Sequence, residues 1–468
     1  MKISTQFQYI KLLYIWAMNK IFIAFLVFLS FNLKAQVVSG PMIGHTDLRT
    51  STIWMQFDES VTNARLIYYN ENSSEKTTSI FNISSGLFKT ATALLYNLEP
   101  GNTYHYSVLV NKKKDTIASG KVTTQTLWQW RDKIIKLPDF SFLTGSCVYM
   151  NQSEYDRLGK PYGNDSSIFE SMANEKADFM LWLGDNWYTR EVDYYSEWGL
   201  HARPSKERAL PIYKKFLKAM PHYAIWDDHD YGWNDADKSY PLKETSREVF
   251  KKYWSNPSYG QNGEGIYTKF TWNDVDVFLL DDRWFRSNDD TKDSINGNVN
   301  INKKMFGEKQ MEWLKNALLQ SNNNYNINFR IIATGSQVLN PVSPFDCLRH
   351  FSAEYKELMD FISDNSINGL VFLTGDRHHS EIIKLDRPNT YPLYDITASP
   401  LTSGSHKFGK EEKDNPFRVV GVEDMQNYSK ISFLGDRKNR VMKVEFFDPK
   451  GVKITDWSVA LKDIKTPK

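Results

Sequence analysis

Short stretches of alternating apolar and polar residues fill the first part of the chain. Over residues 37–125 the segments RTSTIWMQF, ARLIYYN, TATALLYNL, TYHYSVLV and IASGKVTT follow this pattern, which is typical of half-buried strands. Turn residues such as Pro100-Gly101 separate the segments, and none of them has helical spacing. About seven such strands predict an all-β sandwich of the fibronectin III or immunoglobulin type over residues 36–126.

The pattern changes after a linker over residues 127–138. Apolar runs that end in polar or glycine-containing turns now alternate with helical stretches. Such alternation predicts an α/β domain over 138–462, built as two stacked β-sheets flanked by helices. The chain ends in a predicted hairpin that turns at 448–451. The expected helices span residues 165–175, 210–219, 246–254, 308–320 and 353–364.

The N-terminal residues have the pattern of a secretory signal. A basic residue precedes the apolar segment 21–31, and the small Ala35 follows it. This order predicts a signal peptide over 1–35, with an upstream extension over 1–17 if translation starts at Met18. We therefore expect a protein that is exported to the periplasm, the cell surface or the medium and keeps no membrane span after cleavage. An uncleaved membrane anchor is the alternative.

Composition and motifs narrow the function further. The 58 Lys and Arg balance 56 Asp and Glu to a formal net charge of +2, so we expect no nucleic-acid binding patch. We find no G-x-S-x-G elbow of a serine hydrolase, no P-loop and no G-x-G-x-x-G fingerprint. The two cysteines, Cys147 and Cys347, would by default form one disulfide in an exported protein.

Four apolar runs of the second part end in side chains that can bind metal ions. Ligands of α/β sheets bind beyond the carboxyl ends of the strands, so these side chains are expected to converge. Carboxylates suit hard cations such as Ca²⁺, Mn²⁺ or Mg²⁺, whereas imidazole, thiolate and phenolate suit iron, so the mixture could hold two unlike ions. The strand-end residues are Cys147; Asp185, Asn186 and Tyr188; Asp227, Asp228, His229 and Asp230; and Asp376, Arg377, His378 and His379.

The blocks GSC, GDNWYTRE, WDDHD and GDRHH, in this order, resemble the metal-binding blocks of PhoD-like (alkaline phosphatase D) metallophosphatases. That family is related to purple acid phosphatases and calcineurin-like phosphoesterases. The block LLDDRWFR and the order of sandwich before catalytic domain match as well, over roughly residues 37–460. The resemblance implies a phosphoric ester hydrolase that acts on small phosphate mono- or diesters. It also implies a metal-bound hydroxide at a dinuclear site of Fe³⁺ and Ca²⁺, with other divalent ions such as Mn²⁺ still open.

The resemblance further implies roles for individual residues. Asp185 would bridge the two ions, and His229 would protonate the leaving oxygen or stabilise charge. Arg190 and Arg283 would neutralise the substrate phosphate, with ordinary ion pairs as the alternative. Asp227 and Asp230 are expected to be structural. The implied metal ligands are Cys147, Tyr188 and His378 for iron, Asp228 and Asp376 for the harder ion, and Asp185 for both.

Two other functions stay open on the sequence. One is a phosphodiesterase or a phospholipase D-like enzyme that acts on wall polymers, lipids or nucleotides. The other is a catalytically inactive surface-binding protein, which the sandwich and the aromatic content of 14% would also suit. A disulfide between Cys147 and Cys347 would remove the thiolate from the iron site.

Overall fold

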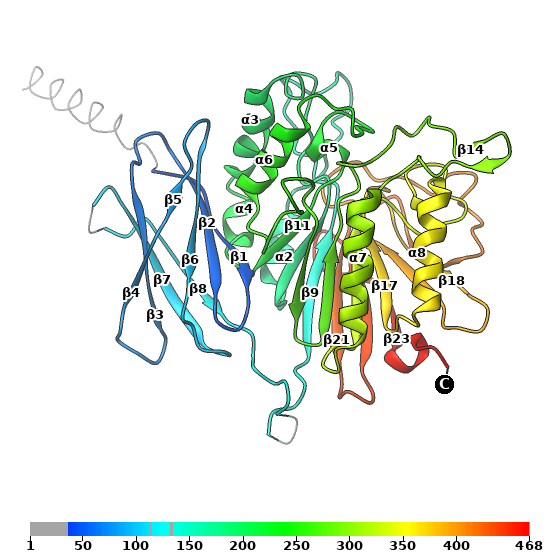
Figure 1. The fold of residues 1–468 in the computed structure, drawn as a ribbon. Helices are drawn as coiled ribbons and strands as arrows, with labels where there is room; N and C mark the ends of the chain where they lie inside the picture. The colour runs from blue at the N-terminus through cyan, green and yellow to red at the C-terminus, as the bar shows by residue number, and fades with distance from the viewer. Residues whose placement is uncertain (1–35, 113–114, 132–133, 468) are drawn as a thin grey trace, which may run out of the picture.

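The structure is a computed structural model that describes residues 36–112, 115–131 and 134–467. A smaller β-rich part stands beside a larger body of sheets and helices (Figure 1). The predicted signal peptide over 1–35 lies outside the described residues. Within the described residues, none of the helices combines the length and the apolar character needed to cross a membrane.

The N-terminal part consists of eight strands in two four-stranded sheets. They are β1 (Val37–Thr46), β2 (Ser51–Phe57), β3 (Ala64–Asn70), β4 (Thr77–Ile80), β5 (Asn82–Ile83), β6 (Lys89–Leu95), β7 (Thr103–Val110) and β8 (Ala118–Thr123). The sheet orders are β1-β2-β6-β5 and β4-β3-β7-β8. Ile53, Leu66 and Tyr106 come from both sheets and lie in one apolar core. The alternating pattern of the sequence therefore corresponds to two sheets that face each other.

The body contains two larger sheets. Their strands are β9 (Phe140–Gly145), β10 (Phe179–Leu183), β11 (His222–Ile225), β12 (Thr268–Trp272), β13 (Val275–Leu279), β16 (Phe329–Thr334), β17 (Leu370–Thr374), β18 (Ser380–Leu385), β19 (Leu393–Thr397), β20 (Arg418–Val422), β21 (Tyr428–Leu434), β22 (Val441–Phe447) and β23 (Lys453–Ala460). A small hairpin, β14 (Ser294–Ile295) and β15 (Asn298–Val299), stands apart from both.

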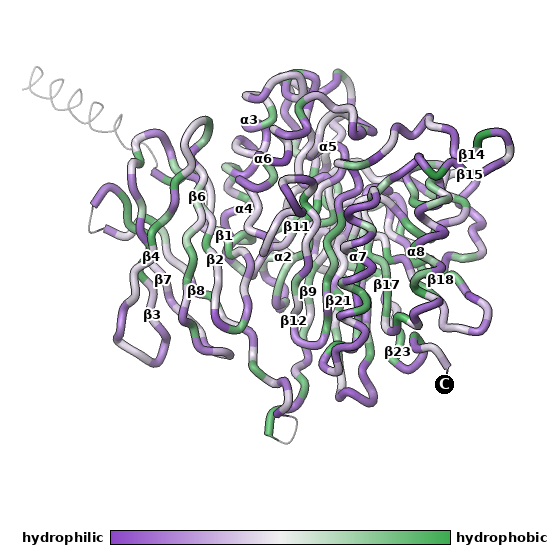
Figure 2. Tube along the Cα trace, in the orientation of Figure 1, coloured by the Kyte–Doolittle hydropathy of each residue, from purple (hydrophilic) through white to green (hydrophobic). Residues whose placement is uncertain are grey.

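The two sheets share one apolar core. The first has the order β11-β10-β9-β21-β22-β23, and the second has the order β12-β13-β16-β17-β19-β18-β20. Phe142 and Leu181 of the first sheet belong to the same buried cluster as Val277 and Ile331 of the second. Figure 2 shows hydrophobic residues along these central strands. The expected pair of stacked sheets is therefore present, and the terminal hairpin turns as predicted, with the Gly451 amide donating to the Asp448 carbonyl at 3.0 Å.

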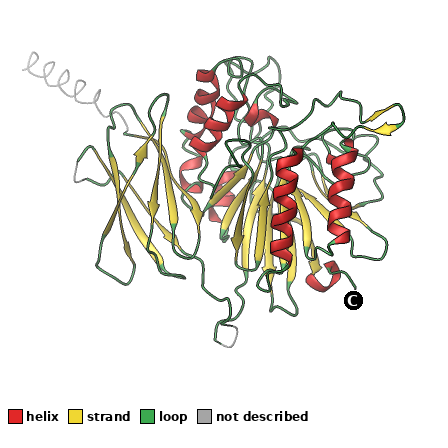
Figure 3. Cartoon of the chain, viewed as in Figure 1, coloured by secondary structure: helices red, strands yellow, loops and turns green. Residues whose placement is uncertain are grey.

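Helices flank the sheets of the body (Figure 3). They are α2 (Ile168–Asn174), α3 (Glu197–Arg208), α4 (Tyr213–Phe216), α5 (Asp228–Tyr231), α6 (Lys243–Tyr253), α7 (Gly307–Asn322), α8 (Ser352–Asp364) and the 3₁₀ turns η1 (Leu348–His350) and η2 (Leu461–Ile464). All five expected helical segments contain a helix. Two helices were not predicted: α5 is a single turn, and α3 contains Gly199 and Pro204, which weaken the helical signal.

The N-terminal sheets pack against the body beside α3 and α6. The indole Nε1 of Trp54 in β2 donates a hydrogen bond to the carbonyl of Lys252 at 2.6 Å. The amide of Gln56 donates to the hydroxyl of Ser205 at 2.6 Å. These contacts attach the sandwich to the helices, away from the strand ends where the predicted ligands lie.

Candidate metal centre

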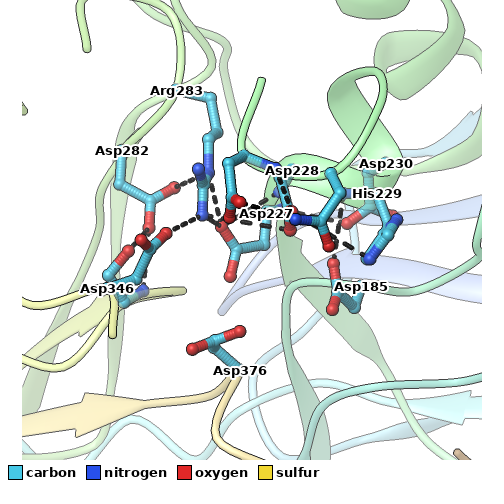
Figure 4. A network of polar contacts seen from close by, with 12 residues as sticks. Asp185, Asp227, Asp228, His229, Asp230, Asp282, Arg283, Asp346 and Asp376 are labelled. Carbon is cyan, nitrogen blue, oxygen red and sulfur yellow. Dashed lines mark hydrogen bonds and ion pairs between the residues drawn. The ribbon is translucent and has the colours of Figure 1, made fainter. Parts of the chain in front are cut away.

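The predicted ligands meet because of the strand order. β10 pairs in parallel with both β9 and β11, so the carboxyl ends of all three strands lie at one edge of the sheet. Cys147, Asp185 and Asp228 follow these three ends, and Asp376 and His378 follow the parallel strand β17 of the second sheet. Side chains from both sheets gather at this edge (Figure 4).

Four of the predicted ligands have left-handed backbones. The φ angles are 62° at Cys147, 50° at Asp185, 66° at Asp376 and 54° at His378. This conformation costs roughly 1–2 kcal/mol in a non-glycine residue, and residues with such strain cluster at functional sites. The turns also brace each other, since the Val148 amide donates to the Asp185 carbonyl at 2.8 Å.

A capping box positions the residues that follow β11. Asp227 is the N-cap of α5, and its amide donates to Oδ2 of Asp230 at 3.0 Å. This reciprocal arrangement satisfies backbone donors at the start of the short helix. Asp227 and Asp230 thus have the structural role expected for them, while Asp228 and His229 occupy the first turn.

The first group of candidate ligands contains Cys147, Asp185 and His378, whose ligand atoms lie within 4.8 Å of one another. Sγ of Cys147 is 3.7 Å from Oδ2 of Asp185. The hydroxyl of Tyr188 is 3.1 Å from Nε2 of His378, so the phenol belongs to the same group. All four side chains are almost fully buried.

The tautomer of His378 suits this arrangement. Its Nδ1 lies 2.6 Å from the carbonyl oxygen of Gly404, which can only accept a hydrogen bond. Nδ1 therefore carries the proton, and the lone pair of Nε2 points to the group that contains Tyr188. A hydrogen bond of this kind orients the ring of a metal-binding histidine.

The second group contains Asp185, Asp228 and His229. The His229 amide donates to Oδ1 of Asp185 at 3.3 Å, and its Nε2 lies 4.0 Å from Oδ2 of Asp228. Asp185 is common to both groups, as a bridging ligand would be. Asp376 belongs to neither group, although it lines the same cleft.

The electrostatics of the two groups fit bound cations. Burial, followed by the charges of Asp228 and Cys147, raises the pKa of Asp185 well above its usual value. Burial and Asp346 raise the pKa of Asp376 to about 6. Burial raises the pKa of Cys147 to about 12, so only a nearby positive charge would favour its thiolate.

One ring nitrogen in the second group is left without a hydrogen-bond partner among the described residues. This atom is the buried Nδ1 of His229. Burial lowers the pKa of His229, and the charge of Asp228 opposes this effect. Burial acts to raise the pKa of Asp228, but His229 and Arg283 outweigh it and lower the pKa. A crowded set of acids beside an unsatisfied imidazole is consistent with a metal site.

The cysteines do not form a disulfide. Cys147 and Cys347 are both free and buried, and Sγ of Cys347 lies 3.6 Å from the carbonyl oxygen of Asn340. The alternative of a disulfide is therefore wrong. Cys347 lies in another loop, where its thiol contacts the backbone of Asn340 instead of Cys147. The thiol of Cys147 remains available as a ligand.

The two predicted catalytic arginines are both engaged by the protein. Arg190 donates to Asp156 and to the carbonyls of Met150 and Tyr188, and its guanidinium lies 3.8 Å from the centre of the Tyr149 ring. This network holds the loop that carries Tyr188.

Arg283 is fully buried and is not among the residues that line the cleft. Its Nε donates to Asp227 at 2.6 Å, and its Nη2 donates to Asp346 at 2.6 Å (Figure 4). The alternative of ordinary ion pairs thus describes the contacts of both arginines.

Another acidic group near the site is already neutralised. His379, Glu381 and Glu412 lie within ligand distance of one another. However, Glu381 pairs with Arg418 at 2.7 Å, and Glu412 pairs with Arg377 at 2.7 Å. These buried pairs leave little negative charge for a cation. His379 therefore faces the ion pairs, whereas its neighbour His378 faces the ligand group.

Sequence reasoning missed two residues that contact His378. The hydroxyl of Tyr162 is 2.9 Å from Nδ1 of His378, and the ring of His406 stacks on His378 with centroids 5.2 Å apart. Both residues come from loops without a strand or helix pattern, and no local signal marked them.

A cleft of about 1310 Å³ opens above the two groups. Cys147 is not among the residues that line it, but six other candidate site residues are: Asp185, Tyr188, Asp228, His229, Asp376 and His378. Buried donors at the floor of a large cleft can hold cations and receive a small anionic ester.

Comparison with known proteins agrees with this geometry. Residues 206–445 match the model of the PhoD-like phosphatase family, and residues 34–125 match that of a domain of unknown function. Alkaline phosphatase D from Bacillus subtilis (strain 168) is 25% identical over 328 residues, which cover 60% of this chain and 52% of that protein. The match thus spans about half the length of this curated relative.

Solved structures share the fold. A structure of PhoD superposes with a TM-score of 0.73 and 18% identity, covering 92% of this chain and 91% of that one. The purple acid phosphatase PPD1 from yellow lupin (Lupinus luteus) seeds gives a TM-score of 0.66 and 10% identity, covering 91% of this chain and 75% of that one. The family model covers more than half of the sequence, including two of the four strand ends that carry the candidate ligands, those of β11 and β17, and the chain therefore belongs to the PhoD-like phosphatase family.

Proposed function

We propose that this protein is a metal-dependent phosphatase that hydrolyses phosphate esters. The observation that carries the proposal is the position of Asp185, which two buried ligand groups share at the floor of the cleft. Membership of the PhoD-like phosphatase family supports the same reaction class. An inactive binding protein would have no need to keep two such groups in strained turns.

The donor chemistry supports two unlike ions. The first group offers thiolate, phenolate and imidazole from Cys147, Tyr188 and His378, which suit Fe³⁺. Asp228 and Asp376 offer carboxylates, which suit Ca²⁺ or Mn²⁺, and Asp185 would bridge. Two bound ions would supply the Lewis acidity that activates water and neutralises the phosphoryl group.

His229 is the proposed acid of the reaction. The residue lines the cleft, and its Nε2 lies 4.0 Å from Oδ2 of Asp228, so the imidazole can donate a proton to a leaving oxygen held beside it. The centre of the His229 ring lies 4.1 Å from the centre of the Tyr188 ring, and this packing limits rotation of the imidazole. General acid catalysis of this kind typically contributes about 10²–10⁴-fold to a rate.

Arg190 and Arg283 act as positioning residues in this proposal. The contacts of Arg190 hold the carbonyls around Tyr188, and those of Arg283 hold Asp227 at the start of α5. Neither guanidinium has to give up these protein contacts in order to bind the substrate. Bound cations, rather than the guanidinium groups, would then balance the charge of the phosphate.

A phosphodiesterase is the second candidate. The cleft of about 1310 Å³ exceeds the ~300–1,000 Å³ that is usual for small-ligand sites, so both organic groups of a diester would fit.

Export of the protein is also a proposal, supported by the signal pattern over 1–35. Fractionation of cells that make the full chain tests it, with a mature N-terminus after Ala35 as the expected result.

Hydrolysis of chromogenic mono- and diesters tests the function. The purified full chain is assayed as isolated, after chelation, and after the return of iron and calcium. We expect chelation to abolish activity and the metals to restore it, with Asp290→Asn as a control that alters an exposed carboxylate of the same cleft. Full activity in the chelated, metal-free protein would refute the proposal, and the ratio of the two rates separates monoesterase from diesterase.

A further inference from the structure

An exposed aromatic side chain stands in the cleft without a structural reason. Phe345 lines the cleft and is 62% exposed, although most of its neighbours there are polar or charged. Ligand pockets are lined mainly by hydrophobic and aromatic side chains, so an aromatic ring exposed within a cleft is a candidate contact for the organic part of a ligand. Neither the metal groups nor the core uses this ring.

The protein holds this ring in a fixed position. The next residue, Asp346, accepts hydrogen bonds or ion pairs from two buried arginines, Arg283 at 2.6 Å and Arg286 at 2.9 Å. Cys347 then continues the backbone into a bridge with Gln337. Phe345 is therefore presented by a braced segment, which is what a binding residue requires.

A cation supports the ring from one side. The guanidinium of Arg377 lies over the Phe345 ring, 4.6 Å from its centre. Arg377 is itself fixed by an ion pair of 2.7 Å with the buried Glu412. With one face covered and 62% of the residue exposed, the opposite face of the ring is accessible from the cleft.

The ring also lies close to the proposed reaction. Arg377 stands between Asp376 and His378 in the sequence, so its side chain begins at the ligand turn. Phe345 and the ligand groups line the same cleft, so the organic group of an ester whose phosphate is held at the ligands can extend toward the ring. We infer that Phe345 determines specificity by stacking against a planar aromatic group of the ester, such as an aryl or nucleobase ring, an inference that rests on the proposed function.

The test compares esters with and without an aromatic group. Phe345→Ser, Phe345→Tyr and the wild type are assayed with phenyl phosphate and glycerol phosphate. We expect Phe345→Ser to lower the kcat/KM ratio of the phenyl to the glycerol ester by about three- to tenfold. Phe345→Tyr keeps the ratio, and Tyr325→Ser, which alters an aromatic side chain that is 63% exposed and lies outside the cleft, leaves it unchanged.

A binding measurement separates this inference from the proposed function. Calorimetry gives the Kd of phenylphosphonate and of methylphosphonate for the same metal-loaded variants, without any turnover. The expected result is a loss of preference for the phenyl compound in Phe345→Ser of the same size. Equal changes for both ligands, or no change, overturn the inference. If the wild type hydrolyses neither ester, the proposed function fails, and the ratio of the two Kd values still decides the role of Phe345.

Discussion

The hydroxyl of Tyr188 lies 3.1 Å from Nε2 of His378, although 190 positions separate the two residues in the chain. Tyr188 follows a strand of the first sheet and His378 follows a strand of the second. Their contact joins the two sheets at the point where Cys147 and Asp185 also arrive. The phenol of Tyr188 is therefore placed to share a ligand group with His378.

Tyr188→Phe is expected to remove one ligand and leave the ring packing in place. The ring centres of Tyr188 and His229 lie 4.1 Å apart, and a phenylalanine ring can keep this contact. The visible absorption band of an iron–phenolate pair should disappear, and iron affinity should fall by at least about 10-fold. Elemental analysis and an absorption spectrum of the same sample measure both effects, with Tyr325→Phe as the control. An unchanged band would exclude the phenol as a ligand.

Asp185→Asn is expected to affect both ions at once. The carboxylate belongs to both ligand groups, whereas an amide cannot bridge two cations with two charged oxygens. We expect the content of both metals to fall and hydrolysis to drop by on the order of 100-fold or more. Metal analysis after dialysis provides a readout that does not depend on turnover. Loss of only one metal would show that Asp185 is a ligand without being a bridge.

Arg283→Met is expected to destabilise the fold. The substitution leaves Asp227 buried without its cationic partner and removes one of the two partners of Asp346. Breaking a buried pair from one side costs about 3–5 kcal/mol. Urea unfolding followed by tryptophan fluorescence measures the change. A variant with wild-type stability and lost activity would instead favour direct contact with the substrate.

Glu207 is expected to make stability depend on pH. Burial raises its pKa from 4.5 to about 7 although Arg203 opposes this, and neither carboxylate oxygen has a hydrogen-bond partner among the described residues. Because the folded pKa lies above the unfolded value, the folded state binds more protons between pH 4.5 and 7. Stability should therefore fall as pH rises through this window, by roughly 3 kcal/mol in total from this group.

Glu207→Gln should flatten this part of the stability profile. The amide removes the ionisation, and Arg203 keeps its ion pair of 2.6 Å with Asp193. Denaturation midpoints measured from pH 4 to pH 9 compare the variant with the wild type and with Glu197→Gln, which alters an exposed residue of the same helix. Parallel profiles for Glu207→Gln and the wild type would contradict the assignment.

Local pattern was sufficient to predict most elements but not all of them. The period-two runs predicted the N-terminal strands, and apolar runs predicted the strands that carry Cys147, Asp185 and Asp376. Helix α3 was missed because Gly199 and Pro204 lower the helical propensity, which the cap at Ser196 and tertiary packing overcome. Helix α5 was missed because one turn is too short to show a period of 3.6 residues.

The sequence by itself determined which chemical groups follow which strands, because apolar runs, turn residues and ligand types are local properties. Only the tertiary structure decided how these groups share the site. It keeps Cys147 and Cys347 apart as free thiols, and it buries Arg190 and Arg283 among protein partners. It also brings Tyr162 and His406 into contact with His378. Contacts between distant segments depend on strand order and on the packing of both sheets, and these carry no signature within a single stretch of sequence.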